Sequence, residues 1–399
     1  ALKHPISVDT YVENTLTGAK AVLIRLIGGE AYWSYGLMSV QDHARRHGIA
    51  LAVLPADGRP DPRLDALSTL PVSTLRRLSD LLEAGGAVAA QAALAQLALS
   101  AGLYARPVAG DKRMPPMGFY DPDDGILTAP RFSGPPVLVS FYRSYLTAAD
   151  TAPVDMLIRK LRAAGFSALG VFAPSLKAPG VADWLRPHLA AHPPVAVVNA
   201  TAFSAQAEDG TTPFDGIDAP VFQVALSTAR KKDWREAERG LSPADLAMHV
   251  VLPEVDGRVF SGVVSFKAPG KKDPDLQFSR FAHRADALLC DRVVARVVNW
   301  HRLRETPARD CRLALVLSTY PGKAHQMAHA VGLDALESTQ AVLETLKTAG
   351  YHVTTGAPLG AALATEAIRW PLADYKAALK ALPQALQDDL LAAWGDPQD

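Results

Sequence analysis

The sequence predicts an α/β fold made of consecutive Rossmann-like units, each built around a parallel sheet, with the last unit truncated. Short runs of β-branched residues alternate with Ala/Leu-rich segments of helical period, and this alternation is typical of βαβ units. The alternation stops in a stretch dense in proline and glycine and then starts again. A third strand signal near the end of the chain is followed only by Ala-rich helical segments, which are too few elements to close a core.

The first α/β unit is predicted over residues 1–105. Its elements are a strand at 21–27, a helix at 34–46, a strand at 49–54 and a long Ala/Leu helical region at 75–99. Gly85 and Gly86 interrupt the last region, because glycine weakens the interior of a helix. The opening residues lack an initiator Met and look like the end of a helix that meets a turn. We therefore expect the chain to be a fragment that lacks sequence at both ends.

A linker is predicted at 106–136, because its many prolines resist both helix and central strand. A second α/β domain is predicted at 137–308. Its strands are expected at 137–141, 169–172, 195–198 and 221–226, and its helices at 154–164, 181–189 and 286–304. The start of a third, truncated α/β unit is predicted at 309–399, with a strand at 312–317 and a helix at 334–349.

The composition argues against several classes of partner. Lys and Arg together number 41, and so do Asp and Glu, so the chain has no electrostatic footprint for nucleic acid or an anionic membrane. No stretch approaches about 20 unbroken apolar residues, and no secretory signal opens the chain. Two cysteines do not make a disulfide framework. We therefore expect a cytoplasmic protein that binds neither nucleic acid nor a membrane.

Several familiar site signatures are absent from the sequence. The segment 268–272 lacks the first glycine and the Ser/Thr of a P-loop, and Gly28-Gly29 lacks the third glycine of a dinucleotide-binding motif. The HExxH and GxSxG motifs do not occur either. The chain therefore offers no nucleotide, zinc-peptidase or hydrolase site of these types.

Arg143 is a candidate site residue because parallel sheets bind ligands at the carboxyl ends of their strands. It follows the strand at 137–141, and the next helix has Asp150 or Thr151 as its expected N-cap. A guanidinium beside a helix N-terminus can hold a carboxylate in a bidentate pair. The alternative is that the loop only caps the helix and that Arg143 lies on the surface.

Asn199, Thr201 and Ser204 follow the strand at 195–198. Amide and hydroxyl groups in such a position can hydrogen-bond a ligand. They can equally satisfy the backbone groups of a turn. The sequence leaves both uses open.

Glu254 and Asp256 lie two residues apart in a turn between a helix and a strand pair. They could ligate a hard cation or pair with Arg258 and Lys267, and structural pairing is the favoured interpretation.

His325 and His329 lie four residues apart in a loop. They could bind a metal only if this loop were helical, and Pro321 and Gly322 argue against a helix. The sequence therefore predicts no metal ligand.

Short sequence blocks, taken in order, resemble a known family. The blocks are 25–33 (RLIGGEAYW), 150–154 (DTAPV), 175–177 (SLK), 199–204 (NATAFS), 240–243 (GLSP), 252–257 (LPEVDG), 264–267 (VSFK), and Tyr320-Pro321 followed by 331–334 (VGLD). The ordered set closely resembles the large subunit of aerobic cobaltochelatase, a family homologous to the porphyrin-binding protein of magnesium chelatase, its H subunit. The resemblance runs from Ile6 to Trp394, and the NATAFS and LPEVDG blocks are its strongest members.

The resemblance implies that the chain is the N-terminal part of the tetrapyrrole-binding subunit of an ATP-dependent cobaltochelatase in cobalamin biosynthesis. The complex of this family forms nitrogen–metal bonds by inserting cobalt into hydrogenobyrinic acid a,c-diamide, a corrinoid tetrapyrrole. Two smaller partner subunits, at least one of them an AAA+ ATPase, supply ATP hydrolysis. The fragment is therefore expected to bind no cofactor and to be inactive alone, with ATP and Co²⁺ as substrates of the complex.

The acidic substrate implied by the resemblance suggests which residues bind it. The predicted substrate-binding residues are the cations Arg143, Lys177, Lys267 and Lys323, the neutral donors Asn199, Thr201 and Ser204, and Tyr320. Tyr32 and Trp33 could stack on the macrocycle or pack in the core. No catalytic or metal-binding residue is predicted, because those of the family lie mainly beyond the end of this chain. Gly322 and His329 stand where many relatives carry Asn, which puts a shared amide role there in doubt.

Two other interpretations of the sequence stay open. One is a non-catalytic, two-lobed α/β module that binds a small ligand between its lobes. The other is a nucleotide-sugar transferase with two Rossmann lobes, which would bind a nucleotide diphosphate tightly.

Overall fold

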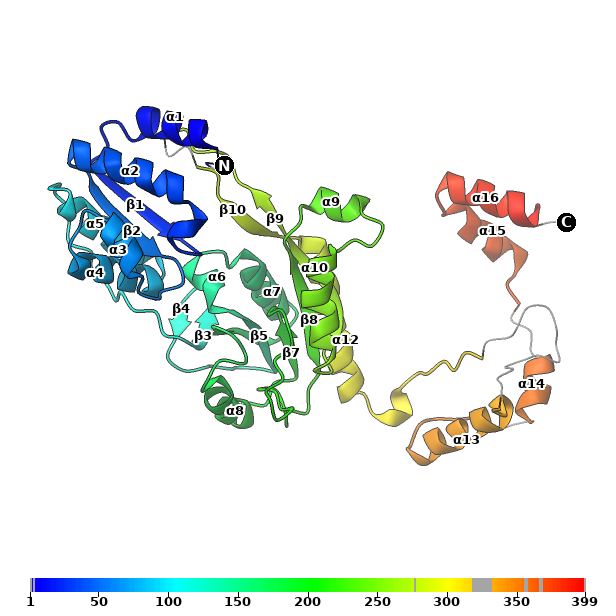
Figure 1. The fold of residues 1–399 in the computed structure, drawn as a ribbon. Helices are drawn as coiled ribbons and strands as arrows, with labels where there is room; N and C mark the ends of the chain where they lie inside the picture. Colours follow the sequence, from blue (N-terminus) through cyan, green and yellow to red (C-terminus); the bar gives the residue numbers. More distant parts are fainter. Residues whose placement is uncertain are drawn as a thin grey trace. The chain divides into compact units, whose positions relative to one another are not determined.

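The computed structural model describes residues 2, 4–275, 278–317, 332–354, 358–365 and 369–397. It divides into two compact units, Ala1–His301 and Arg302–Asp399, whose elements are labelled in Figure 1. The first unit carries a two-stranded sheet and an eight-stranded sheet. Parallel strands and helices alternate through it, so the predicted α/β class with Rossmann-like parallel strands is confirmed.

The two-stranded sheet pairs β1 (Ala21–Leu26) with β2 (Ala50–Pro55) in parallel. Every residue of β2 is buried, and its side chains alternate between two cores. Leu51 and Val53 pack in one core and Ala52 and Leu54 in the other. The first core lies against α1 (Pro5–Thr15), α2 (Ser34–His47) and α3 (Pro62–Leu67), and the second against α4 (Val72–Ala84) and α5 (Ala87–Ser100).

The predicted break in the long Ala/Leu region is confirmed at Gly85 and Gly86. Both adopt a positive φ, a conformation that favours glycine, and they separate α4 from α5. A Cβ at Gly85 would lie 2.5 Å from Cγ2 of Thr147. Thr147 ends α6 (Arg143–Thr147), so this glycine also lets the N-terminal helices approach the larger sheet.

The eight-stranded sheet has the order β10-β9-β8-β7-β5-β6-β3-β4. Its central strands run parallel, while β10, β3 and β4 pair antiparallel at the edges. The strands are β3 (Gly118–Asp121), β4 (Gly125–Leu127), β5 (Pro136–Tyr142), β6 (Ser167–Ala173), β7 (Ala196–Asn199), β8 (Val221–Ser227), β9 (Val259–Pro269) and β10 (Phe281–Ala285). The strands expected at 137–141, 169–172, 195–198 and 221–226 are thus confirmed.

Helices cover both faces of the larger sheet (Figure 1). One core lies between the strands and the helices α7 (Ala152–Ala163) and α12 (Ala287–Glu305), and the other lies under α8 (Val181–Ala191). The connection from β8 to β9 carries α9 (Lys231–Glu236), α10 (Pro243–Leu246), the π-helical segment η2 (Ala247–Val251) and α11 (Leu252–Glu254). Parallel strands need such long crossovers.

The segment predicted as a linker, 106–136, contains β3 and β4. Both are short and antiparallel. β4 is the edge strand, and β3 pairs with β4 on one side and with β6 on the other. The prolines of the segment lie outside β3 and β4, where they remove no hydrogen bond from the ladder of either strand.

The second unit contains η3 (Ala308–Asp310), α13 (Ala335–Thr348), α14 (Leu359–Thr365), α15 (Leu372–Lys380) and α16 (Gln384–Trp394). The predicted helix at 334–349 is confirmed as α13, whose N-cap Asp334 accepts hydrogen bonds from two backbone N–H groups. The predicted strand at 312–317 is wrong: these residues are irregular and Val316 is 86% exposed. An apolar run becomes a strand only where a neighbour completes its ladder, and the described part of this unit supplies none.

No helix within the described residues is both long enough and apolar enough to cross a bilayer.

Candidate functional site

The chain reverses its direction of strand addition at β5, which makes a topological switch point. After β5 it adds β6 on one side and then β7 on the other. In open α/β sheets, ligands bind outside the carboxyl ends of the strands at such a point. Here those ends carry Tyr142 on β5 and Asn199 on β7, so this edge is our candidate functional site.

A buried network of amide and hydroxyl groups ties β5, β7 and β8 together at this edge. Asn199 Nδ2 donates to Gln223 Oε1 at 2.6 Å, and Asn199 Oδ1 accepts from the hydroxyls of Ser140 and Thr201. The carbonyl of Thr201 accepts from Asn199 Nδ2 at 3.1 Å and from Gln223 Nε2 at 2.8 Å. Because buried polar groups are costly when unpaired, this network fixes the start of the loop 200–206.

A buried ion pair holds the rest of that loop. Asp256 Oδ2 lies 2.6 Å from Arg258 Nη2, and the two side chains are only 1% and 2% exposed. Asp256 also accepts hydrogen bonds from Ser204 Oγ and from the backbone N–H of Ala205, both at 2.6 Å. Burial lowers the pKa of Arg258, and Asp256 opposes that shift. Asp256 therefore has two roles, since it balances the buried guanidinium and caps the loop.

Phe203 occupies the tip of the loop in a left-handed conformation, with φ at +63°. Its backbone N–H donates to the carbonyl of Met248 at 2.8 Å, and its own carbonyl accepts from Arg258 Nη1 at 3.4 Å. Next to it, Tyr142 donates from its hydroxyl to the carbonyl of Ala202 at 2.7 Å. Phe203 is 49% exposed.

Two buried histidines lie near the same edge. His249 belongs to η2 and His283 to β10, and they are 5% and 6% exposed. His283 Nδ1 lies 3.0 Å from the hydroxyl of Ser265, and the His283 backbone N–H donates to Asp150 Oδ1 at 2.9 Å. Burial lowers the pKa of both imidazoles, with partial opposition from Asp245. Both rings are therefore neutral at pH 7.

A tyrosine and an aspartate complete the surroundings of the histidines. The ring of Tyr145 meets that of His283 edge to face, with centroids 5.6 Å apart, and burial raises the pKa of Tyr145 to about 12. Asp245 accepts from the Ser227 hydroxyl at 2.8 Å and from both the N–H and hydroxyl of Thr228 at 3.0 Å. Among the described residues, no three His, Cys, Asp or Glu side chains are grouped so that they could hold a metal ion.

The structure brings Asn199, at the end of β7, together with Thr201 and Ser204 of the loop 200–206. Asn199 and Thr201 are fully enclosed, so their groups support the loop, and contact with a ligand stays a prediction for them. Lys267 lies on β9 directly opposite His283 of β10.

The other predicted cations are placed elsewhere. Arg143 donates to three backbone carbonyls, those of Ala84, Met114 and Pro115, and it thereby joins the N-terminal helices to the larger sheet. Lys177 is exposed in the loop after β6. Tyr320 and Lys323 lie outside the described residues, as do His325 and His329.

Sequence reasoning missed four members of this edge: Phe203, Gln223, His249 and His283. A glutamine inside the apolar run 221–226 was the available signal for Gln223. The favoured pairing interpretation for Asp256 is confirmed with Arg258. Phe203 lies within the block 199–204 but was not singled out there, and no local pattern distinguishes the two histidines from ordinary residues.

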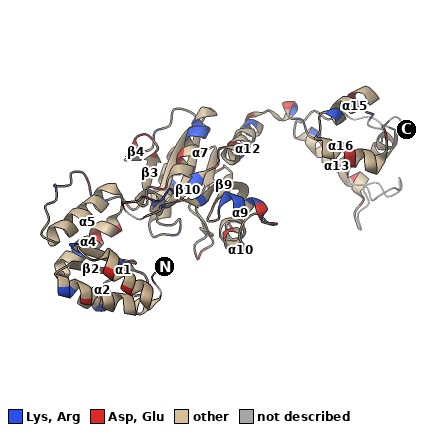
Figure 2. Ribbon diagram, turned by 90° about the horizontal axis from the view of Figure 1, so that it is seen from above, with Lys and Arg blue, Asp and Glu red and all other residues tan. Residues whose placement is uncertain are grey.

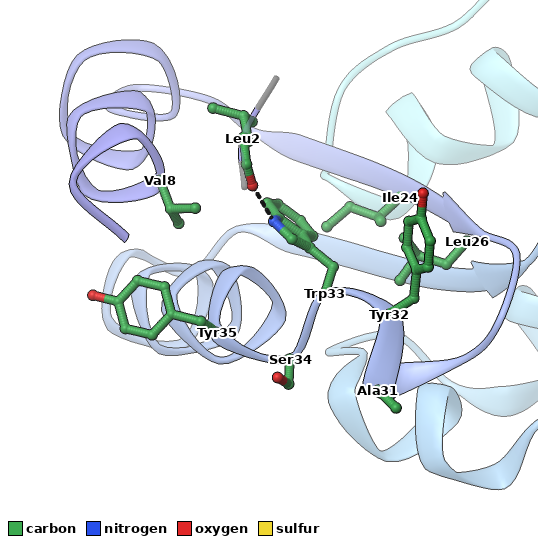
Figure 3. Close-up of a pocket in the computed structure, with 9 residues that line it drawn as sticks. All are labelled: Leu2, Val8, Ile24, Leu26, Ala31, Tyr32, Trp33, Ser34 and Tyr35. Carbon is green, nitrogen blue, oxygen red and sulfur yellow. Dashed lines mark hydrogen bonds between the residues drawn. The ribbon is translucent and has the colours of Figure 1, made fainter. Parts of the chain in front are cut away.

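A separate pocket of about 760 Å³ lies beside the two-stranded sheet (Figure 3). It is lined by Leu2, Val8, Ile24, Leu26, Ala31, Tyr32, Trp33, Ser34 and Tyr35. Trp33 Nε1 donates to the carbonyl of Leu2 at 2.6 Å, and the indole lies against Gly36, where a Cβ would come within 2.0 Å of it. Tyr35 donates to Asp9 at 2.8 Å, while Tyr32 is exposed.

A polar pocket of about 340 Å³ adjoins the first one and shares Leu26 and Ala31 with it. It lies at the carboxyl ends of β1 and β2 and has side chains of both charge signs. Basic and acidic residues are mixed in the same way along other elements of the first unit, such as α9 (Figure 2).

Comparisons with known proteins identify related chains. The family described as CobN/Magnesium Chelatase matches residues 80–399. The aerobic cobaltochelatase subunit CobN of Sinorhizobium sp is 31% identical over 440 aligned positions, covering 100% of this chain and 34% of that protein. The same subunit from Pseudomonas aeruginosa is 32% identical over 441 positions with the same coverage. The H subunit of magnesium chelatase from Rhodobacter capsulatus is 27% identical, and its match covers 60% of this chain and 22% of that protein.

A solved structure is also similar. The catalytic subunit of cobaltochelatase from Mycobacterium tuberculosis superposes with a TM-score of 0.71 at 27% identity, over 98% of this chain and 33% of that one. The chain thus spans about a third of the length of the CobN relatives that it matches.

Proposed function

This chain belongs to the CobN/magnesium chelatase family, and we propose that it forms part of the tetrapyrrole-binding subunit of an ATP-dependent cobaltochelatase. The full complex would insert cobalt into hydrogenobyrinic acid a,c-diamide in cobalamin biosynthesis, forming nitrogen–metal bonds. The observation that carries this proposal is similarity to cobaltochelatase subunits along the whole chain. Similarity to magnesium-chelatase subunits covers 60% of the chain or less among the relatives from Rhodobacter capsulatus and rice, which favours cobalt over magnesium.

We assign ATP to partner subunits of the AAA+ type. The sequence has no P-loop, and a nucleotide hydrolysed by this chain would need an equivalent cradle for its phosphates. Co²⁺ enters as a substrate of the complex, and we assign no metal ligand within this chain. The proposed site of the reaction is the cytoplasm.

We propose that this part of the subunit binds the tetrapyrrole and docks the partner subunits. Its candidate edge has fixed loops, aromatic rings and neutral imidazoles, which suit recognition of a ligand. Arg143, Lys177, Lys267 and Lys323 remain the proposed partners for the substrate's carboxylates, and Tyr320 remains a proposed substrate-binding residue.

Binding of the substrate tests the proposal. The full chain is titrated with hydrogenobyrinic acid a,c-diamide and, in parallel, with protoporphyrin, while tryptophan fluorescence and ligand absorbance are recorded. We expect saturable binding with preference for the corrinoid. Saturable binding of a nucleoside diphosphate, with none of either tetrapyrrole, would contradict the proposal and favour the transferase interpretation.

A second assay addresses the reaction itself. The whole subunit, with and without this region, is combined with its ATPase partners, and cobalt insertion is followed by absorbance. We expect insertion to be lost when the region is removed and restored when the chain is supplied as part of the intact protein. Unchanged insertion without the region would exclude it from the tetrapyrrole-binding machinery.

A further inference from the structure

Phe203 combines a strained backbone with an exposed ring. Only two non-glycine residues in the described chain have positive φ, Ala149 and Phe203. For a bulky side chain this conformation is a true outlier, and such strain persists only where the surrounding structure imposes it. Phe203 is 49% exposed, so full burial of the residue does not compensate for the strain.

The surrounding structure imposes this conformation from several sides. The N–H of Phe203 is bonded to Met248 of the π-helical segment, and its carbonyl faces Arg258. Asp256 caps the two residues that follow Phe203. Single π-helical turns are found frequently at functional sites. The loop is therefore built to present the residue at position 203 at the sheet edge.

We propose that Phe203 is an aromatic contact for the planar face of the tetrapyrrole macrocycle at the switch point of the larger sheet. This inference rests on the proposed function, since that function supplies the macrocycle. A flat apolar ring system stacks favourably on an aromatic side chain, and the carboxyl edge of β5 and β7 is where an open α/β sheet binds ligands.

The pocket beside the two-stranded sheet is the competing location, and two of its three aromatic residues, Trp33 and Tyr35, have hydrogen-bond partners within the fold. Trp33 is bonded to Leu2 and packs on Gly36, and Tyr35 is bonded to Asp9. Packing of the N-terminal helices thus accounts for both residues. Tyr32 is exposed too, but it is not among the residues with positive φ. Phe203 combines exposure with a strained backbone, so we place the contact there.

The test separates loss of the ring from relief of the strain. Phe203→Asn removes the ring and suits a left-handed backbone, whereas Phe203→Tyr keeps both the ring and the strain. Ala149→Gly relieves the other strained position and serves as the matched control, and Tyr32→Ser probes the competing pocket. Each full chain is titrated with hydrogenobyrinic acid a,c-diamide, and its urea midpoint is measured.

We expect Phe203→Asn to raise the urea midpoint and to weaken the affinity for the corrinoid about tenfold or more. Phe203→Tyr should leave both values near those of the parent, and Ala149→Gly should raise the midpoint without changing the affinity. Unchanged affinity in Phe203→Asn would overturn this inference but not the proposed function. A loss of affinity confined to Tyr32→Ser would have the same consequence. Absence of binding by the parent chain would overturn the proposed function as well.

Discussion

The two sheets of the first unit organise their surroundings in opposite ways. Beside the two-stranded sheet there is open space, a pocket of about 760 Å³ whose walls are apolar and aromatic. At the carboxyl ends of β5, β7 and β8 of the eight-stranded sheet, amides, hydroxyls and an ion pair are buried against one another, with two buried histidines nearby. The first region offers a pocket with mostly apolar and aromatic walls, and the second offers a buried polar network beside the exposed Phe203.

This difference determines which kinds of substitution each region tolerates. An apolar pocket is sensitive to shape, because a displaced ring loses contacts with its neighbours. A buried polar network is sensitive to the loss of a single partner, because the remaining group is left desolvated and unpaired. We therefore expect electrostatic substitutions to cost most at the larger sheet and steric ones to matter most at the smaller sheet.

The largest effect is expected from Asp256→Ala. It leaves the guanidinium of Arg258, 2% exposed, without its carboxylate, and it removes the caps of Ser204 and Ala205. Breaking a buried pair in this way costs about 3–5 kcal/mol. The free energy of unfolding from urea denaturation measures the loss.

Two controls sharpen this result. Asp256→Ala combined with Arg258→Met removes both charges, and we expect it to recover part of the lost stability. Asp42→Ala breaks the exposed ion pair between Asp42 and Arg46 in the N-terminal region and should change stability little. Similar losses for Asp42→Ala and Asp256→Ala would show that the two regions do not differ electrostatically.

A smaller, steric effect is expected from Gly36→Ala beside the two-stranded sheet. A Cβ at this position would lie 2.0 Å from Cε2 of Trp33, so the indole must move and its bond to Leu2 must lengthen. Overpacking of this kind costs about 1–3 kcal/mol. Alanine's better helix propensity, worth about 1 kcal/mol, offsets only part of that cost.

The Trp33→Leu background is the control for Gly36→Ala. There the obstructing ring is absent, and the same substitution should be neutral or stabilising in urea denaturation. If Gly36→Ala stabilises the parent chain too, the close packing of Trp33 is not what shapes the pocket.

The smallest effect is expected from pH at the histidine pair. Burial lowers the pKa of His249 and His283 in the folded chain, so the unfolded chain binds protons more readily. Stability should therefore be complete above the unfolded value, about 6.5, and should decline as pH falls below it. Urea denaturation between pH 8 and pH 5 measures the decline.

The variant His249→Gln/His283→Gln isolates the histidines' share of this decline. Its stability should fall less steeply below pH 6.5 than that of the parent, whatever its stability at pH 8. An equally steep fall in the variant would assign the pH dependence to other groups.

The sequence by itself determined most elements of the first unit. Hydrophobic period identified β1, β2, β5, β6, β7 and β8, and the paired glycines identified the break at Gly85 and Gly86, because these features depend on neighbours a few residues away. The same reasoning failed at 312–317, where an apolar run has no strand partner among the described residues. Whether a segment finds a partner strand depends on residues far away in the sequence, and the periodicity of the segment carries no information about them.

Only the tertiary structure decided how the candidate site is built. The blocks at 199–204 and 252–257 stood out separately in the sequence, but folding joins them through Asp256 and Ser204, 52 residues apart. Folding also buried Asn199, assigned Arg143 to three backbone carbonyls and gave Phe203 its left-handed backbone. The physical reason is that local preference depends on adjacent residues, whereas the pairing of a polar group depends on whatever the fold brings beside it.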